Sequence, residues 1–82
     1  MKVFYNENFA DCYSIFIDDF PNRNGKYECI TSSKYPTHPL GIYQHCDVDA
    51  EFYENKDGTE VEIDFDSLPE EVKQCVLSEM VD

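Results

Sequence analysis

The chain has 82 residues, and its 18 acidic and 6 basic side chains give a formal net charge of −12 at pH 7. This length holds one domain, and no apolar run approaches the roughly 20 residues that a membrane span needs. Such an acidic surface repels nucleic acid and anionic membranes, which excludes direct binding to either. Aromatic residues make up 15% of the chain, which is more than an acidic disordered tail carries, so we predict a single folded domain over residues 1–82.

The start of the chain and its cysteines favour a cytoplasmic protein. Polar residues follow Met1 too early for the apolar region of a secretion signal to form. In a reducing compartment we expect the cysteines to remain free thiols. They are Cys12, Cys29, Cys46 and Cys75.

In chain order, short runs of β-branched and aromatic residues predict strands over 2–5, 12–17, 26–32 and 40–46. The segment 21–25 has the composition of a turn. The C-terminal part predicts a helix with Ser67 as its N-cap and Glu70 completing a capping box. An apolar stripe at helical spacing runs along it, formed by Leu68, Val72, Cys75, Val76 and Met80.

Residues 48–65 alternate between apolar and acidic side chains on both sides of a turn at 55–58, which predicts an antiparallel hairpin. The predicted fold is therefore α+β, a small antiparallel sheet of about five or six short strands with one C-terminal helix packed on it. One face of the hairpin is predicted to be acidic and exposed to solvent. It consists of Asp49, Glu51, Glu60, Glu62 and Asp64, with Asp47 and Glu54 at its margin.

The negative charge is concentrated in the second half of the chain, because residues 45–82 contain thirteen acids and two bases. Like charges that face each other across strands destabilise a sheet by about 0.2–1 kcal/mol per pair. We therefore interpret the acidic face as a binding surface for a basic protein, with a nucleic-acid-binding protein as the expected partner. Carboxylates two residues apart on a strand lie about 6.5–7 Å apart, which is similar to the phosphates of a nucleic-acid strand. The chain would act as a monomer or homodimer; alternatively, its acidity serves only solubility.

A second hypothesis is a small zinc-binding protein that uses Cys29, His38, His45 and Cys46. The spacing of known zinc knuckles is missing, and adjacent residues such as His45 and Cys46 point to opposite faces of a strand. We therefore expect no cofactor. The chain also lacks a glycine-rich phosphate loop and a serine-centred elbow, which predicts that it is not an enzyme.

Two segments resemble a pattern in small uncharacterised proteins of phages and mobile elements. The first runs from His38 to Cys46 (HPLGIYQHC), and the second runs from Phe65 to Glu71 (FDSLPEE) and opens the predicted helix. The resemblance covers about the second half of the chain and implies a bacterial or phage cytoplasmic setting, with no activity or catalytic residue attached. Phage inhibitors of restriction and CRISPR enzymes are similarly short and acidic, and this likeness implies a partner of the same defence type.

Overall fold

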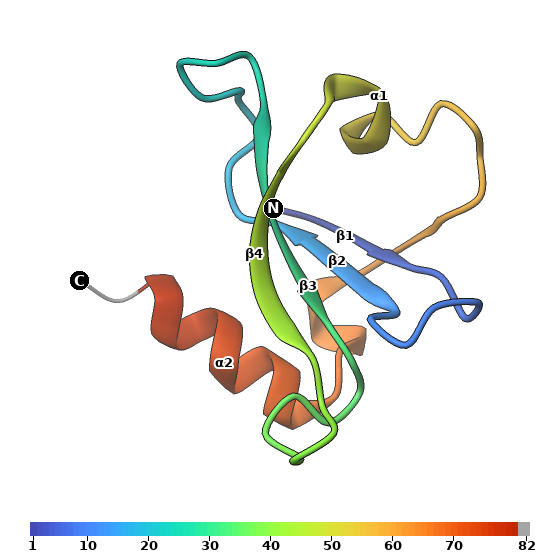
Figure 1. Ribbon diagram of the computed structural model, residues 1–82, viewed down its shortest axis with the longest axis vertical. Helices are drawn as coiled ribbons and strands as arrows, with labels where there is room; N and C mark the ends of the chain where they lie inside the picture. Colours follow the sequence, from blue (N-terminus) through green and yellow to red (C-terminus); the bar gives the residue numbers. More distant parts are fainter. Residues whose placement is uncertain (81–82) are drawn as a thin grey trace.

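The computed structural model describes residues 1–80 and contains one antiparallel sheet of five strands (Figure 1). The strands lie in the order β4-β3-β2-β1-β5, so the first four form a meander and β5 adds to the free side of β1. Together with the C-terminal helix, this sheet confirms the predicted α+β fold. The strands are β1 (Lys2–Tyr5), β2 (Tyr13–Phe16), β3 (Tyr27–Ser32), β4 (Tyr43–Val48) and β5 (Val61–Ile63).

The helices are α1 (Ala50–Tyr53) and α2 (Glu70–Met80), and a 3-10 turn (Phe65–Ser67) precedes α2. No helix within residues 1–80 combines the length and the apolar composition that crossing a membrane requires.

The prediction that Ser67 caps the C-terminal helix is wrong, because α2 begins only at Glu70. Pro69 disfavours helical dihedrals in the residue before it, and Leu68 is indeed extended, with ψ at 148°. The extended Leu68 therefore separates Ser67 from the helix.

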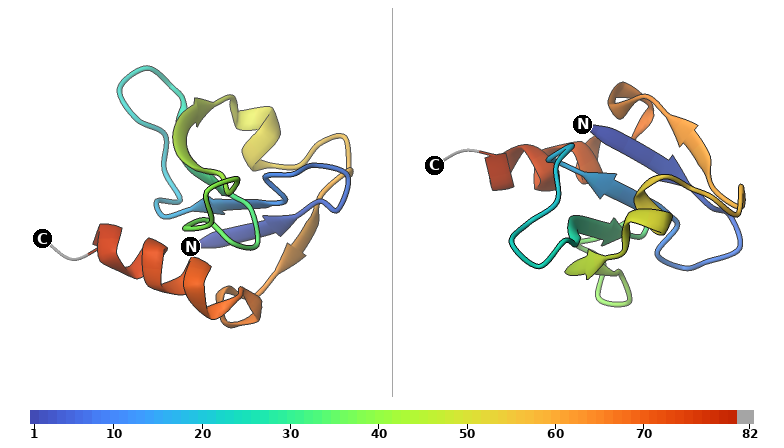
Figure 2. Two further views of the ribbon diagram at one scale, coloured as in Figure 1. Left: turned by 60° about the horizontal axis from the view of Figure 1, so that its bottom comes forward. Right: turned by 90° about the horizontal axis from the view of Figure 1, so that it is seen from above.

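One face of the sheet, here called the helix face, is covered by α2 (Figure 2). Val72 and Val76 are fully buried there against Val3, Ile15 and Ile30 of the sheet. The predicted apolar stripe is thus confirmed over most of its length. It ends before Met80, which is 48% exposed.

The opposite face of the sheet, here called the far face, has its own small core around Phe16. The Phe16 ring lies 6.1 Å from Phe4, 5.9 Å from Phe52 and 5.1 Å from Tyr53, measured between ring centroids. Tyr53 also stacks on Tyr27 at 4.1 Å. The single turn of α1 therefore covers the far face at the end of β4, on the other side of the sheet from α2 (Figure 2).

The predicted hairpin over residues 48–65 is wrong, because β4 and β5 form opposite edges of the sheet. Its turn does form: the Gly58 amide donates to the Asn55 carbonyl over 3.0 Å, and both residues have positive φ. However, Val48 and Phe52 are four residues apart. Side chains at this spacing lie on the same side of a strand and also on the same side of a helix, so the pattern fits both structures. The helical turn buries Phe52 and Tyr53 against Phe16, which an exposed hairpin would not allow.

Candidate functional site

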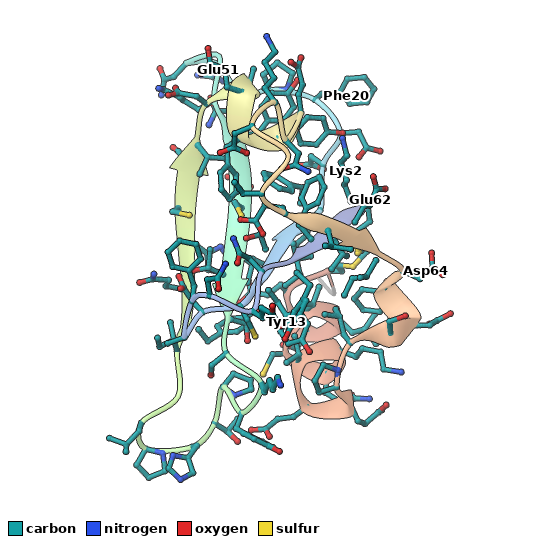
Figure 3. The ribbon with its side chains drawn as sticks, turned by 90° about the vertical axis from the view of Figure 1, so that its right-hand side faces the viewer. Lys2, Tyr13, Phe20, Glu51, Glu62 and Asp64 are labelled. Atoms are coloured by element: carbon teal, nitrogen blue, oxygen red, sulfur yellow. The ribbon has the colours of Figure 1, made fainter. Side chains whose placement is uncertain are left out.

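The carboxylates predicted to form one acidic face are divided between the two edges of the sheet. Asp47 lies in β4, Asp49 and Glu51 lie at the start of α1, and Glu54 follows that helix. Glu62 lies in β5 and Asp64 directly follows it, at the other edge. Figure 3 shows Glu51 at one end of the molecule, with Glu62 and Asp64 beside β5. The predicted single acidic face is therefore wrong, and the carboxylates form two separate groups.

The first group surrounds a groove of about 750 Å³ between β4, α1 and the turn that follows α1. Both lysines of its lining already have partners: Lys26 pairs with Asp49, and the Lys56 Nζ lies 3.4 Å from a Glu54 carboxylate oxygen. The other carboxylates of the lining form no ion pair with any residue in the range 1–80. The groove is lined by Lys26, Asp47, Val48, Asp49, Glu51, Phe52, Asn55, Lys56 and Asp57.

Glu28 does not line the groove, but it lies next to the groove residue Asp47. The β3–β4 register places Glu28 directly opposite Asp47, and both side chains are exposed. Two like charges in this arrangement destabilise the sheet by about 0.2–1 kcal/mol. Both residues also line a smaller pocket of about 300 Å³ with His45 and Cys46. If the predicted strands 26–32 and 40–46 had been paired as a hairpin across their loop, the sequence would have predicted that Glu28 lies close to Asp47.

The second group has a different environment, because a lysine lies near it. Glu62 is opposite Phe4, so it faces the far face, and Lys2 lies two residues farther along β1 on that same face. The Lys2 Nζ donates to the Tyr53 carbonyl over 3.2 Å and lies 4.4 Å from the centroid of the Tyr53 ring. The charge of Lys2 therefore lies among aromatic rings on the far face, and the β5 edge is less suited to a basic partner than the groove.

Glu60 is not part of an exposed acidic face, because its side chain is half-buried. Its Oε2 has no hydrogen-bond partner among residues 1–80. Burial raises the pKa of the Glu60 carboxyl, and the nearby Asp57 and Asp11 raise it further, while a hydrogen bond with Asn6 opposes the shift. Asn55 holds the main chain of Glu60 through both its amide oxygen and its amide nitrogen, at 3.2 and 2.8 Å. Glu60 is therefore a partly buried carboxyl whose charged form is disfavoured, and it is unsuited to contact a partner.

We predict that Glu60→Gln stabilises the protein at neutral pH, by up to about 1 kcal/mol after allowance for solvent screening. Because the pKa of Glu60 is raised by folding, its ionisation favours the unfolded state, and stability is lost as the pH rises through the folded-state pKa. Urea denaturation at a series of pH values tests this. The free energies of unfolding of the variant and the parent should converge at pH values below the ordinary glutamate pKa of 4.5. A variant that is less stable at pH 7 would contradict the prediction.

The residues of the zinc hypothesis do not converge. Cys29 and Cys46 share the far face, while His45 lies on the helix face with its Nε2 3.3 Å from a Glu79 carboxylate oxygen. His38 lies in the β3–β4 loop, where its Nδ1 accepts a hydrogen bond from the Leu40 amide over 3.0 Å. In the described part of the chain, no three metal-binding side chains come together. The opposite orientation predicted for His45 and Cys46 is confirmed, and the structure does not bring the four residues of the zinc hypothesis together.

These features define a small α+β protein with an antiparallel sheet between α1 and α2 and an acidic groove at one edge. No protein-family model matches the chain, and neither a curated protein nor a solved structure shows significant similarity to it. The resemblance of His38–Cys46 and Phe65–Glu71 to phage proteins stays a prediction.

Proposed function

We propose that this protein is a non-enzymatic binding module whose groove beside β4 and α1 engages a basic surface of another protein. The observation that supports the proposal is the pair formed by Glu28 and Asp47, two exposed carboxylates that the sheet register holds opposite each other at a cost in stability. Glu51 and Asp57 add two further carboxylates without an ion-pair partner in the range 1–80.

The lining of the groove suits an arginine or lysine side chain. Val48 and Phe52 offer apolar surface to the aliphatic stem of such a residue, while the carboxylates around them attract its charged head. Arginine fits best because its planar guanidinium forms paired hydrogen bonds with a carboxylate. The charge of the whole chain, −12, would also steer a basic protein toward the groove and speed their encounter.

The partner we propose is a protein that binds nucleic acid through a channel lined with lysine and arginine. Asp47 and Asp49 are two residues apart in nearly extended chain, a spacing of about 6.5–7 Å that is comparable with successive phosphates of one strand. Glu28 extends the array sideways onto β3. The module would then compete with nucleic acid for the same channel.

Reversing the charge of Asp47 tests this proposal. We expect Asp47→Lys to weaken binding of an oligoarginine peptide about tenfold, which corresponds to about 1.4 kcal/mol. Glu7→Lys is the matched control, because it changes the net charge equally from the β1–β2 turn, outside the groove lining. Fluorescence anisotropy of a labelled peptide at low and physiological salt measures both affinities. Salt should weaken the binding of the parent, since exposed charges are screened within about 8–10 Å.

Equal losses in the two variants would mean that only bulk charge matters and would overturn the proposed groove. Thermal unfolding controls for damage to the fold, because Asp47→Lys turns the repulsive pair with Glu28 into an attractive one and should not lower the unfolding temperature. If a protein partner is captured on the immobilised chain, we expect duplex DNA to displace that partner from the chain, because the two would compete for the same channel. A partner that binds DNA and this protein simultaneously would contradict the mimic.

A further inference from the structure

Cys29 and Cys46 form a cross-strand pair of thiols. The β3–β4 register makes them direct partners, and both side chains belong to the far face. Directly opposed residues of antiparallel strands have Cα atoms about 4.5–5.5 Å apart, which lies within the range of about 4.4–6.8 Å found for disulfides. Both are free cysteines here. The backbone therefore places two thiols, seventeen residues apart in the sequence, where a bond between them is possible.

The two thiols differ in their access to solvent. Cys29 is only 1% exposed and lies in the far-face core beside Phe4 and Phe16. Cys46 is half-buried and belongs to β4, an edge strand with no neighbour on its outer side. It also lines the small pocket of about 300 Å³ along that edge. A small reagent in solution can therefore reach Cys46 first, and Cys29 only through Cys46.

We propose that Cys29 and Cys46 form a thiol–disulfide exchange site that reacts with small disulfides of the glutathione type. The Cys46 thiolate attacks one sulfur of the small disulfide, forms a mixed disulfide and releases one small thiol, which takes up a proton. The Cys29 thiolate then attacks the Sγ of Cys46 and releases the second small thiol. In total the two protein thiols are oxidised to one disulfide, while one small disulfide is reduced to two thiols. This inference is independent of the proposed binding function.

The surroundings of the pair make the exchange slow at neutral pH. Burial raises the pKa of the Cys29 thiol to about 12, and the neighbouring Cys46 adds to this shift. Burial also raises the pKa of Cys46; its contact with Cys29 opposes the shift, and the carboxylates of Asp47 and Asp11 reinforce it. Because the thiolate is the attacking form, the exchange should accelerate as the pH rises above neutral.

The hydrogen-bond pattern between β3 and β4 also indicates that a disulfide between Cys29 and Cys46 is easily reduced. The Ser33 amide donates to the Ile42 carbonyl over 2.9 Å, so this pair, one step beyond the ladder, is a hydrogen-bonded one. Because such pairs alternate along an antiparallel ladder, Cys29 and Cys46 occupy a hydrogen-bonded position too, with Cα atoms about 5.5 Å apart. Their Cβ atoms then lie beyond the mean of about 3.8 Å for disulfides, so the strands must draw together. Strained disulfides of this kind are the labile ones.

The test uses the variant Cys12→Ala/Cys75→Ala, which keeps only the proposed pair, incubated with oxidised glutathione under native conditions. After alkylation of the remaining thiols, intact mass spectrometry should show a protein that has lost two hydrogen atoms and carries neither alkyl group nor glutathione. Its unfolding midpoint should rise by an amount on the order of 10 °C, because the bond restricts the unfolded chain. Excess reduced glutathione should reverse both changes.

Two single variants separate the roles of the thiols. Adding Cys29→Ala should stop the reaction at the mixed disulfide on Cys46, and adding Cys46→Ala should leave Cys29 unmodified in the folded protein. A stable mixed disulfide with both cysteines present, or two thiols that stay free at high pH, would overturn the proposal. If the two-cysteine variant does not fold, peptide mapping of the oxidised parent replaces it. A disulfide that joins Cys12 or Cys75 to either member of the pair would then be the contrary result.

Discussion

Replacing Phe16 with alanine is expected to lower the free energy of unfolding by about 3–5 kcal/mol. Phe16 is fully buried, and its ring contacts Phe4 of β1. It also contacts Phe52 and Tyr53, which joins α1 to the sheet. A domain of this size buries only about 60% of the surface of its unfolded chain, so its total stability should be near the lower end of the usual range of about 5–15 kcal/mol. One truncation would therefore remove most of the stability.

Urea denaturation followed by circular dichroism measures the effect of Phe16→Ala. Phe20→Ala is the matched control, because Phe20 is 80% exposed and its truncation should change the stability by less than about 0.5 kcal/mol. Similar losses in both variants would mean that the far-face core contributes little to the fold. Phe16→Ala should also weaken the binding of the oligoarginine peptide, since Phe52 lines the groove and packs on Phe16.

A carboxylate in place of Val76 is expected to unfold the protein at neutral pH. Val76 is fully buried between α2 and the helix face, and the loss of its burial alone costs about 1.5–3 kcal/mol. The new carboxylate would also be buried without a partner, which costs several kcal/mol more unless it is protonated. Leu77→Asp is the control, because the next residue along α2 is 42% exposed.

The loss in Val76→Asp should be smaller in mild acid. Burial raises the pKa of an aspartate in the folded state, so stability is retained below its ordinary pKa of about 4 and lost as the pH rises through the raised value. Circular dichroism of the two variants at pH 4 and pH 7 measures this. A folded Val76→Asp variant at pH 7 would contradict the packing of α2 on the sheet.

The parts of the fold that depend on local patterns could be predicted from the sequence. β1, β2 and β3 each lie within a predicted run, because their apolar and β-branched residues are contiguous. The stripe of Val72 and Val76 defined α2 and its buried side. By contrast, β4 extends to Val48, two residues beyond the predicted end of that strand. The prediction stopped too early because Val48 also fits the alternation of the expected hairpin.

The site depended on pairings between distant segments, which local patterns do not specify. Val61 and Ile63 have the right alternation for a strand, but nothing in that alternation selects β1 over β4 as the neighbour. Glu28 and Asp47 meet only because the β3–β4 register brings them together. The prediction of acidic partner-binding residues therefore included Asp47, Asp49 and Glu51 of the groove, included Glu60 wrongly as an exposed residue, and omitted Glu28.

The placement of carboxylates on both open edges of the sheet also affects how copies of this chain meet one another. An exposed edge strand offers unpaired amide and carbonyl groups to a second sheet, and natural proteins protect such edges with charge. Here Asp47 lies on one edge and Glu62 on the other, so a second copy that docked like edge to like edge would bring carboxylate against carboxylate. The charges that suit a basic partner thus also keep identical chains apart.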